Sequence, residues 1–247
     1  MSALESQSPL VQTTAAFVRE QFQSHDASHD WAHIERVWTL ARTIAREEVQ
    51  SYIPLLAYNM YQERLIVCAQ NVSEASLEIV DLAALLHDID DYKYQATGAP
   101  TTRALHFLES QNAPSETTTR VMAIIDTMGF KEELGGQTVR ETTVEFGCVQ
   151  DADRLDAIGA IGVARCFTYG GHIRRALYDS HEPPTETDVT QEQYLQQMSA
   201  SIDIFYQKLF KLRGRMKTGA GRRIAEERHA FMKTFVTQFY NEISGRG

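Results

Sequence analysis

The sequence predicts an all-α protein that folds as a single domain over residues 1–247. Apolar residues recur at helical spacing along most of the chain, glycine and proline mark the breaks, and no linker, internal repeat or low-complexity tract divides it. With 43% hydrophobic and 23% charged residues, the chain can bury a sizeable core. We expect core motifs at about residues 25–165 and C-terminal helices at about 191–243 packed on them.

Two helices are expected in the first part of the chain. The first spans residues 10–23, and the second follows a polar break that ends at Asp30. Asp30 or Ser28 is expected to cap the second helix, and His33 lies near its beginning. The stretch 50–76 fits either a helix or an irregular excursion. The apolar stripe of the second helix consists of Ile34, Val37, Leu40, Ala41 and Ile44.

Further helices are expected in the middle of the chain. One spans residues 75–88, one runs from the loop at 98–102 to about residue 110, and one begins at 114–115. Glycines at 129–136 then mark a long loop or a short hairpin.

The C-terminal part is expected to hold a buried helix over residues 149–167 and two final helices at about 191–211 and 220–243. A polar loop at 179–190 separates them. Two glycines on the buried helix would let another helix approach closely. The two glycines are Gly159 and Gly162, and the residues expected on buried faces are Leu155, Ile158, Ile161, Gly162, Phe231, Phe235, Phe239 and Tyr240.

Composition and charge argue against several classes of function. A formal net charge of −9 disfavours a broad nucleic-acid-binding surface. No stretch is apolar for long enough to span a bilayer, and the start lacks a secretory signal pattern. Cys68, Cys148 and Cys166 form no CxxC pair, which favours a reducing, cytoplasmic location. The expected partner is a small molecule, and a homo-oligomer is left open.

The most informative stretch runs from Leu82 to Lys93, where an apolar helix ends in a polar cluster. Four of the five residues from His87 to Asp91 are acidic or imidazole groups. Like charges at this density repel unless a cation or protons compensate them. Carboxylates and neutral imidazoles are common metal ligands, so the stretch indicates a metal site.

Three segments offer metal ligands on or beside a helix: His33, His87 with Asp88, and Asp153. Two imidazoles and two carboxylates suit Mn, Co, Ni, Fe or Zn and leave positions for water and substrate. Any one of these histidines alone is more often a surface residue or a satisfied core residue. Their order and context carry the hypothesis.

That order resembles the HD superfamily of metal-dependent phosphohydrolases. The similar segments are residues 29–37, 84–88 and 151–156, and the sequence looks most like the small single-domain branch that includes nucleoside triphosphate pyrophosphohydrolases. The resemblance covers most of the chain and implies an HD-type helical bundle. It extends to residues 158–165, 217–218 and 224–229.

The resemblance implies that one divalent metal ion is held by His33, His87, Asp88 and Asp153. Manganese is favoured, with Co, Ni, Fe, Zn or Mg as alternatives. Dinuclear members have further histidines between the central motif and the last aspartate. Only His106 lies in that interval, so a single ion is expected.

The resemblance also suggests catalytic roles. Asp91 has the position of an acidic group that assists the attacking water; otherwise it is a solvated residue that closes a helix. Lys93 is expected to bind a phosphate oxygen, against the alternative of an exposed loop lysine. Arg154 binds phosphate or pairs with Asp151, and pairing is favoured. His29 is expected to line the pocket.

The predicted activity is hydrolysis of a (deoxy)nucleoside triphosphate to a monophosphate and pyrophosphate. The resemblance supplies most of this prediction, and the chain has no G-x-x-x-x-G-K-[ST] loop that would favour attack at the γ phosphorus. A nucleoside monophosphatase, a cyclic-nucleotide phosphodiesterase and a non-enzymatic nucleotide sensor remain alternatives. Basic residues at 208–223 either attract a polyphosphate or form a solvated helix face, and the solvated face is favoured.

Overall fold

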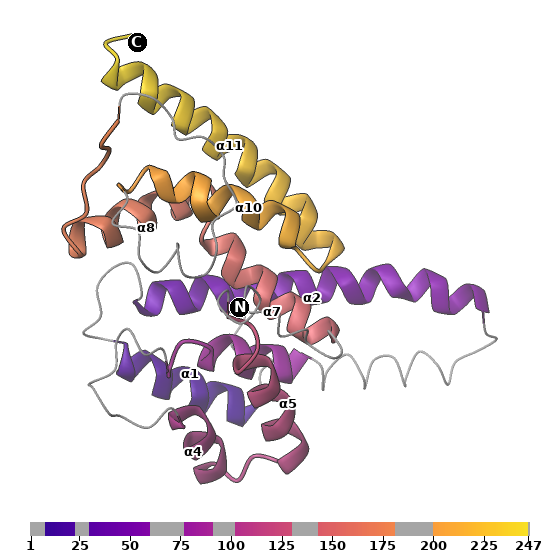
Figure 1. Ribbon diagram of the computed structural model, residues 1–247. Coiled ribbons are helices and arrows are strands. Elements are labelled where there is room, and N and C mark those ends of the chain that lie inside the picture. The colour runs from indigo at the N-terminus through magenta and orange to yellow at the C-terminus, as the bar shows by residue number, and fades with distance from the viewer. Residues whose placement is uncertain are drawn as a thin grey trace. The chain divides into compact units, whose positions relative to one another are not determined.

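The computed structural model describes residues 8–22, 30–59, 77–90, 102–129, 143–180 and 200–246, with the side chains of 51–59 excepted. Every regular element in these residues is a helix, which confirms the predicted all-α class (Figure 1). None of these helices combines the length and apolarity that a bilayer crossing requires. The expectations for residues 60–76, for the glycine-rich segment 130–142 and for the polar loop after residue 180 lie outside the described residues.

The chain divides into two compact units. The first comprises residues 1–129 and 139–150, and the second comprises 130–138 and 151–247. The single-domain organisation therefore stays a prediction. In chain order the helices are α1 (Pro9–Gln21), α2 (Trp31–Asn59), a helix over residues 77–86, α4 (Arg103–Ser110), α5 (Ser115–Ile125), α7 (Val144–Asp156), α8 (Gly159–His172), a π-helix (Phe205–Leu209), α10 (Phe210–Leu212), a 3₁₀ helix (Arg213–Arg215) and α11 (Gly219–Ile243).

The first unit is organised around α2 and the helix over residues 77–86. The predicted stripe of α2 is confirmed at Ile34, Val37, Ala41 and Ile44, which are fully buried. Residues 82–86 are also fully buried, so the last part of this helix is apolar on every side, as a segment in the centre of a core must be. α2 continues to Asn59, beyond the stripe from which it was predicted. α4 and α5 pack on one another in the same unit (Figure 1).

The helix predicted over residues 75–88 ends at residue 86, and residues 87–90 form a turn. The Ile89 amide donates to the carbonyl of Leu86 at 3.1 Å, three residues back, where a continuing α-helix would reach four residues back. The Nδ1 atom of His87 lies 2.8 Å from the carbonyl of Ala84, the acceptor that Asp88 would use in such a helix. The polar cluster therefore lies in a turn at the end of the helix.

In the second unit, the helix predicted over 149–167 is two helices, because α7 ends at Asp156 and α8 begins at Gly159. Gly159 has a φ of +75°, in the left-handed region that glycine adopts without steric cost. A Cβ at this position would lie 2.9 Å from Cγ of Arg228 on α11, so the glycine also allows a close approach by α11. That close approach was predicted, and the break was not.

Two other expectations for this region are wrong. A Cβ on Gly162 would lie 2.2 Å from the carbonyl oxygen of Ala157, so this glycine accommodates the break itself and not another helix. Ile161 is 43% exposed, because the new helix begins at Gly159 and turns a different face toward the core.

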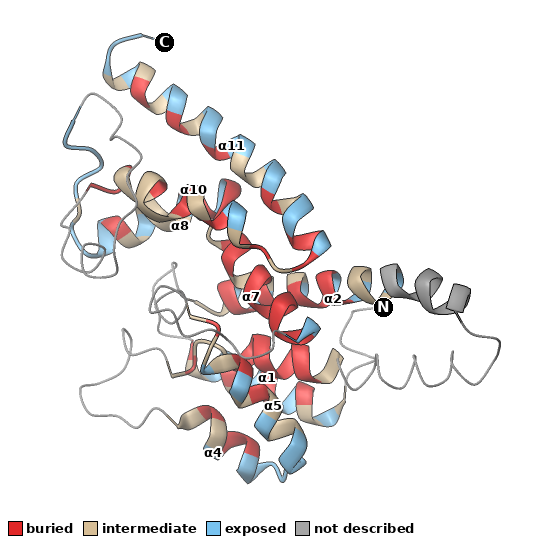
Figure 2. Ribbon diagram, turned by 45° about the vertical axis from the view of Figure 1, so that its right-hand side comes forward, coloured by how far each residue is buried: buried red, intermediate tan, exposed pale blue. Residues whose placement is uncertain are grey.

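Aromatic side chains fill the second unit between α8, the π-helix and α11. Phe167 contacts three of them, with centroid distances of 6.1 Å to Phe205, 5.9 Å to Phe235 and 6.0 Å to Phe239. Phe231, expected in the core, is 48% exposed. The fully covered stripe of α11 passes through Met232, Val236 and Tyr240, one residue further round the helix (Figure 2).

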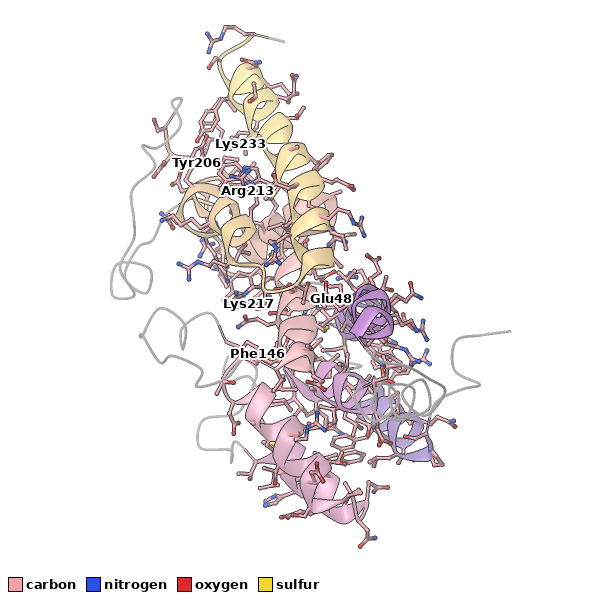
Figure 3. All side chains as sticks on the ribbon, turned by 90° about the vertical axis from the view of Figure 1, so that its right-hand side faces the viewer. Glu48, Phe146, Tyr206, Arg213, Lys217 and Lys233 are labelled. Atoms are coloured by element: carbon pink, nitrogen blue, oxygen red, sulfur yellow. The ribbon has the colours of Figure 1, made fainter. Side chains whose placement is uncertain are left out.

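Two basic residues of the second unit contact defined partners. Arg213 pairs with Glu226 at 3.1 Å, and both side chains are exposed, as the predicted solvated face requires. The ammonium group of Lys233 lies 4.2 Å from the centre of the Phe210 ring, which Tyr206 also contacts (Figure 3). A cation over an aromatic ring in this way is attracted to the face of its π-system.

Candidate metal centre

His33 is positioned by the first turn of α2. Its backbone amide lies 3.0 Å from Oδ1 of Asp30, which is the bond by which an N-cap side chain accepts from the third helical residue. The predicted cap at Asp30 is therefore confirmed, and Ser28 lies outside the described residues. Because the cap fixes the first turn, His33 is held on a rigid element with a side chain that is only 1% exposed.

His87 and Asp88 begin the turn that follows the helix over residues 77–86. The Nδ1 atom of His87 lies 2.8 Å from the carbonyl of Ala84, and because a carbonyl only accepts, Nδ1 carries the proton. The lone pair of the neutral ring is then on Nε2. A backbone carbonyl that fixes the tautomer in this way is typical of metal-binding histidines.

The three side chains converge on one point. Oδ2 of Asp88 lies 3.3 Å from Nε2 of His33 and 3.3 Å from Nε2 of His87, and the three ligand atoms are all within 4.8 Å of one another. Donors about 2.1 Å from a shared ion are about 3.0 Å apart at a right angle and about 3.4 Å apart at a tetrahedral angle. The two 3.3 Å separations therefore fit Asp88 and each imidazole as ligands of one divalent ion.

Burial and charge support the same interpretation. The side chains of His33, His87 and Asp88 are 1%, 2% and 20% exposed, so solvent reaches the cluster from the carboxylate side. Burial alone would raise the pKa of Asp88, but the charge of the adjacent His87 and His33 rings in their protonated form, and the hydrogen bonds that those rings then donate, hold it well below its usual range. Asp88 is therefore an ionised carboxylate in a largely enclosed site, a setting in which a cation is stabilised.

The other predicted site residues lie either in the second unit or outside the described residues. Asp153 lies half-buried on α7, in the part of that helix that belongs to the second unit. Asp91, Lys93 and His29 lie outside the described residues. His106 is exposed on α4.

The neighbours of Asp153 on α7 have structural roles in the second unit. The buried carboxylate of Asp151 accepts hydrogen bonds from the amides of Lys217 and Thr218 and from the Thr218 hydroxyl, which caps the start of α11. Burial raises the pKa of Asp151, and these hydrogen bonds partly oppose the rise. Arg154 donates to the carbonyl of Arg215 at 3.1 Å.

A buried carboxylate on the helix that leads to His87 escaped sequence reasoning. Asp81 is 4% exposed and accepts from Nε1 of Trp38 at 2.8 Å and from Arg42 at 3.0 Å. Since Arg42 lies further along α2 than His33 while Asp81 precedes His87, the two helices run antiparallel. The visible signal was one acidic residue inside an otherwise apolar run.

The HD domain family model matches residues 30–158, about half of the chain. The Bacillus subtilis protein YpgQ is 32% identical over 93% of this chain and 91% of its own length. The chain belongs to the HD-domain family. The matched residues include the converging His33, His87 and Asp88, so the predicted HD-type metal-dependent phosphohydrolase is confirmed at the level of class.

Solved structures of similar proteins agree with this assignment. A Lactobacillus plantarum protein has a TM-score of 0.74 and 32% identity, covering 97% of this chain and 98% of its own. An HD-superfamily hydrolase from Bacillus thuringiensis has a TM-score of 0.63 and 30% identity, covering 96% and 97%. YpgQ, solved in complex with ADP, has a TM-score of 0.64 and 31% identity, covering 94% and 98%.

Proposed function

We propose that this HD-domain protein hydrolyses (deoxy)nucleoside triphosphates to a nucleoside monophosphate and pyrophosphate. The observation that carries the proposal is the convergence of His33, His87 and Asp88 on one point at separations that suit a divalent ion. The ADP complex of YpgQ, whose structure aligns over 94% of this chain, supports a nucleotide as the ligand.

Asp153 is proposed as the fourth ligand of a single ion. This assignment rests on the HD-type sequence pattern, in which Asp153 follows the family's Ala-Asp-Arg-Leu order at residues 152–155. A set of two imidazoles and two carboxylates suits manganese, and the same set accepts Co, Ni, Fe or Zn. Magnesium prefers more oxygen ligands and is the weaker candidate.

Further residues of the chain are proposed to orient a metal ligand, accept a proton and bind phosphate. The Ala84 carbonyl holds His87 in the tautomer whose Nε2 lone pair is available to a metal. Asp91 is proposed to accept the proton of the attacking water, and Lys93 to hold a phosphate oxygen. When bound, a divalent ion in such a site supplies Lewis-acid activation of water and of a phosphoryl oxygen.

The bond to be broken is the one between the α phosphorus and the bridging oxygen. ADP is compatible with attack at either the α or the γ phosphorus, so the YpgQ complex does not choose between them. Attack at γ is usually accompanied by a glycine-rich loop that this sequence lacks. The HD-type resemblance to pyrophosphohydrolases supports attack at α.

Hydrolysis in ¹⁸O-labelled water tests the choice directly. A panel of ribo- and deoxyribonucleoside triphosphates is incubated with protein and Mn²⁺, and products are read by mass spectrometry. Label in the monophosphate, with unlabelled pyrophosphate, is the expected result. Label in free phosphate with diphosphate accumulating would contradict it, as would turnover of monophosphates or cyclic nucleotides alone.

Composition bears on the expected partner and on the cellular location of the protein. The net charge of −9 is compatible with a small-molecule partner and disfavours a broad nucleic-acid surface. A cytoplasmic location is proposed from the absence of paired cysteines in the sequence.

A further inference from the structure

We propose that Asp90 and Arg103 form a clamp that positions the turn carrying His87 and Asp88 for metal binding. Neither residue belongs to the predicted ligand set, and both lie in the first unit. The clamp rests on the metal centre of the proposed function and is independent of which nucleotide is hydrolysed.

The first half of the clamp is the carboxylate of Asp90. Its Oδ1 accepts from the backbone amide of Arg103 and its Oδ2 from that of Ala104, each at 3.1 Å. These are the first two residues of α4, whose N-cap residue Thr102 makes no side-chain capping bond. Asp90 therefore caps α4 from the metal-bearing turn, and the helix N-terminus favours the negative charge.

The second half is the side chain of Arg103, which returns to the same turn. Its Nη1 donates to the carbonyl of Ile89 at 3.2 Å, and its Nη2 donates to Oε1 of Gln21 at the end of α1. The guanidinium group thus ties the residue after Asp88 to two helices. Three hydrogen bonds join residues 89 and 90 to the start of α4, in both directions.

These bonds fix the residues that follow His87 and Asp88 in the chain, beyond the end of the preceding helix. The helix over residues 77–86 ends before His87, and within the turn the backbone amide of Ile89 donates to the carbonyl of Leu86 across Asp88. Metal binding requires Oδ2 of Asp88 to stay near both imidazoles, since small displacements separate ligands from a shared ion. Asp90 and Arg103 are accordingly positioning residues.

The test measures Mn²⁺ affinity and apo-protein thermal stability in the full chain, by the electron paramagnetic resonance signal of free Mn²⁺ and by thermal unfolding. Asp90→Ala removes both capping acceptors and is expected to weaken Mn²⁺ binding by about tenfold or more. Asp90→Asn keeps one carbonyl acceptor and the fold, and is expected to retain affinity to within about threefold.

The matched control is Ser8→Ala, which removes another helix cap in the same unit. Ser8 accepts from the amide of Val11 at the start of α1 and bonds Glu78, at the opposite end of the helix that leads to His87. The Ser8→Ala variant should have lower thermal stability and unchanged Mn²⁺ affinity.

Wild-type affinity in Asp90→Ala, or an equal loss of affinity in Ser8→Ala, would overturn the clamp while leaving the metal centre intact. Absence of Mn²⁺ binding in the wild type would overturn the metal centre as well. Loss of nucleotide turnover alone, with these affinities as expected, would bear only on the proposed substrate.

Discussion

Asp88 shows how residue-scale geometry decides the chemistry of this protein. One carboxylate oxygen lies 3.3 Å from two imidazole nitrogens, and the pKa of Asp88 is held well below its usual range by those imidazoles despite its burial. A lone histidine or aspartate carries no such information. Three donors at ligand spacing, two of them nearly inaccessible to solvent, make a divalent ion the simplest occupant.

Asp91 supplies the first prediction at this scale. Asp91→Asn keeps the size of the side chain and removes its ability to accept a proton. Turnover of the triphosphate is expected to fall by roughly 10²–10⁴ while Mn²⁺ affinity is retained. Steady-state kinetics with a parallel metal titration measures both. Unchanged turnover would leave Asp91 as a solvated residue.

The second prediction concerns Asp81 and the pH dependence of the free energy of unfolding. Burial raises the pKa of Asp81 to about 6, against the opposing effects of Arg42 and Trp38. Because the folded state holds this proton more tightly than the unfolded state, the stability that the group contributes is greatest below pH 4 and is lost as pH rises through 6. The loss amounts to at most about 3 kcal/mol.

Asp81→Asn removes this titration and keeps an acceptor for Trp38. The difference in free energy of unfolding between wild type and variant is therefore expected to shift against the wild type as pH rises from 4 to 7. Chemical denaturation of both proteins across that range measures the shift. Parallel pH profiles would mean that Asp81 does not titrate in this window.

At the scale of elements, the break between α7 and α8 depends on the backbone of one residue. Gly159 has a φ of +75° and leaves space for the Arg228 side chain, which donates to the carbonyl of Leu155 at the end of α7. The break thus separates α7 from α8 where the residue pattern indicated one helix. A side chain at Gly159 would strain the backbone and displace Arg228.

Gly159→Ala is accordingly expected to destabilise the protein by about 2–3 kcal/mol, combining left-handed strain with the displaced contact. Gly171→Ala is the matched control, because Gly171 lies in α8 and a Cβ added there would meet no atom within 4 Å. At that position alanine should stabilise by about 0.5 kcal/mol. Denaturant titration of both variants compares them. Equal effects of the two would contradict the role of the positive φ.

At the scale of the whole molecule, the HD-domain match spans residues 30–158 and so takes in segments of both units. His33, His87 and Asp88 belong to the first unit, while Asp153 follows on α7 in the second. Removing a bound metal ion should lower the free energy of unfolding of the chain without removing its helices.

Mn²⁺ at about one hundred times its Kd is expected to stabilise the chain by about 2.7 kcal/mol, which raises Tm by roughly 5–10 °C for a chain of this length. Far-ultraviolet circular dichroism should stay helical after chelation. The shift in Tm should disappear in His87→Ala and in Asp153→Ala, and persist in Glu226→Gln, which changes an exposed carboxylate paired with Arg213. A full shift in Asp153→Ala would remove Asp153 from the ligand set.

The sequence by itself determined the helical class and the residue types of the metal site, and it narrowed the cap of α2 to Asp30 or Ser28. These are encoded locally, in periodicity, in a capping residue before a helix and in an HD-type order of ligands. Only the tertiary structure decided that Asp88 lies between His33 and His87, that Gly159 breaks a helix, and that Asp90 caps α4. Each depends on contacts between segments distant in sequence or on a backbone angle, and local residue patterns carry no signal for either.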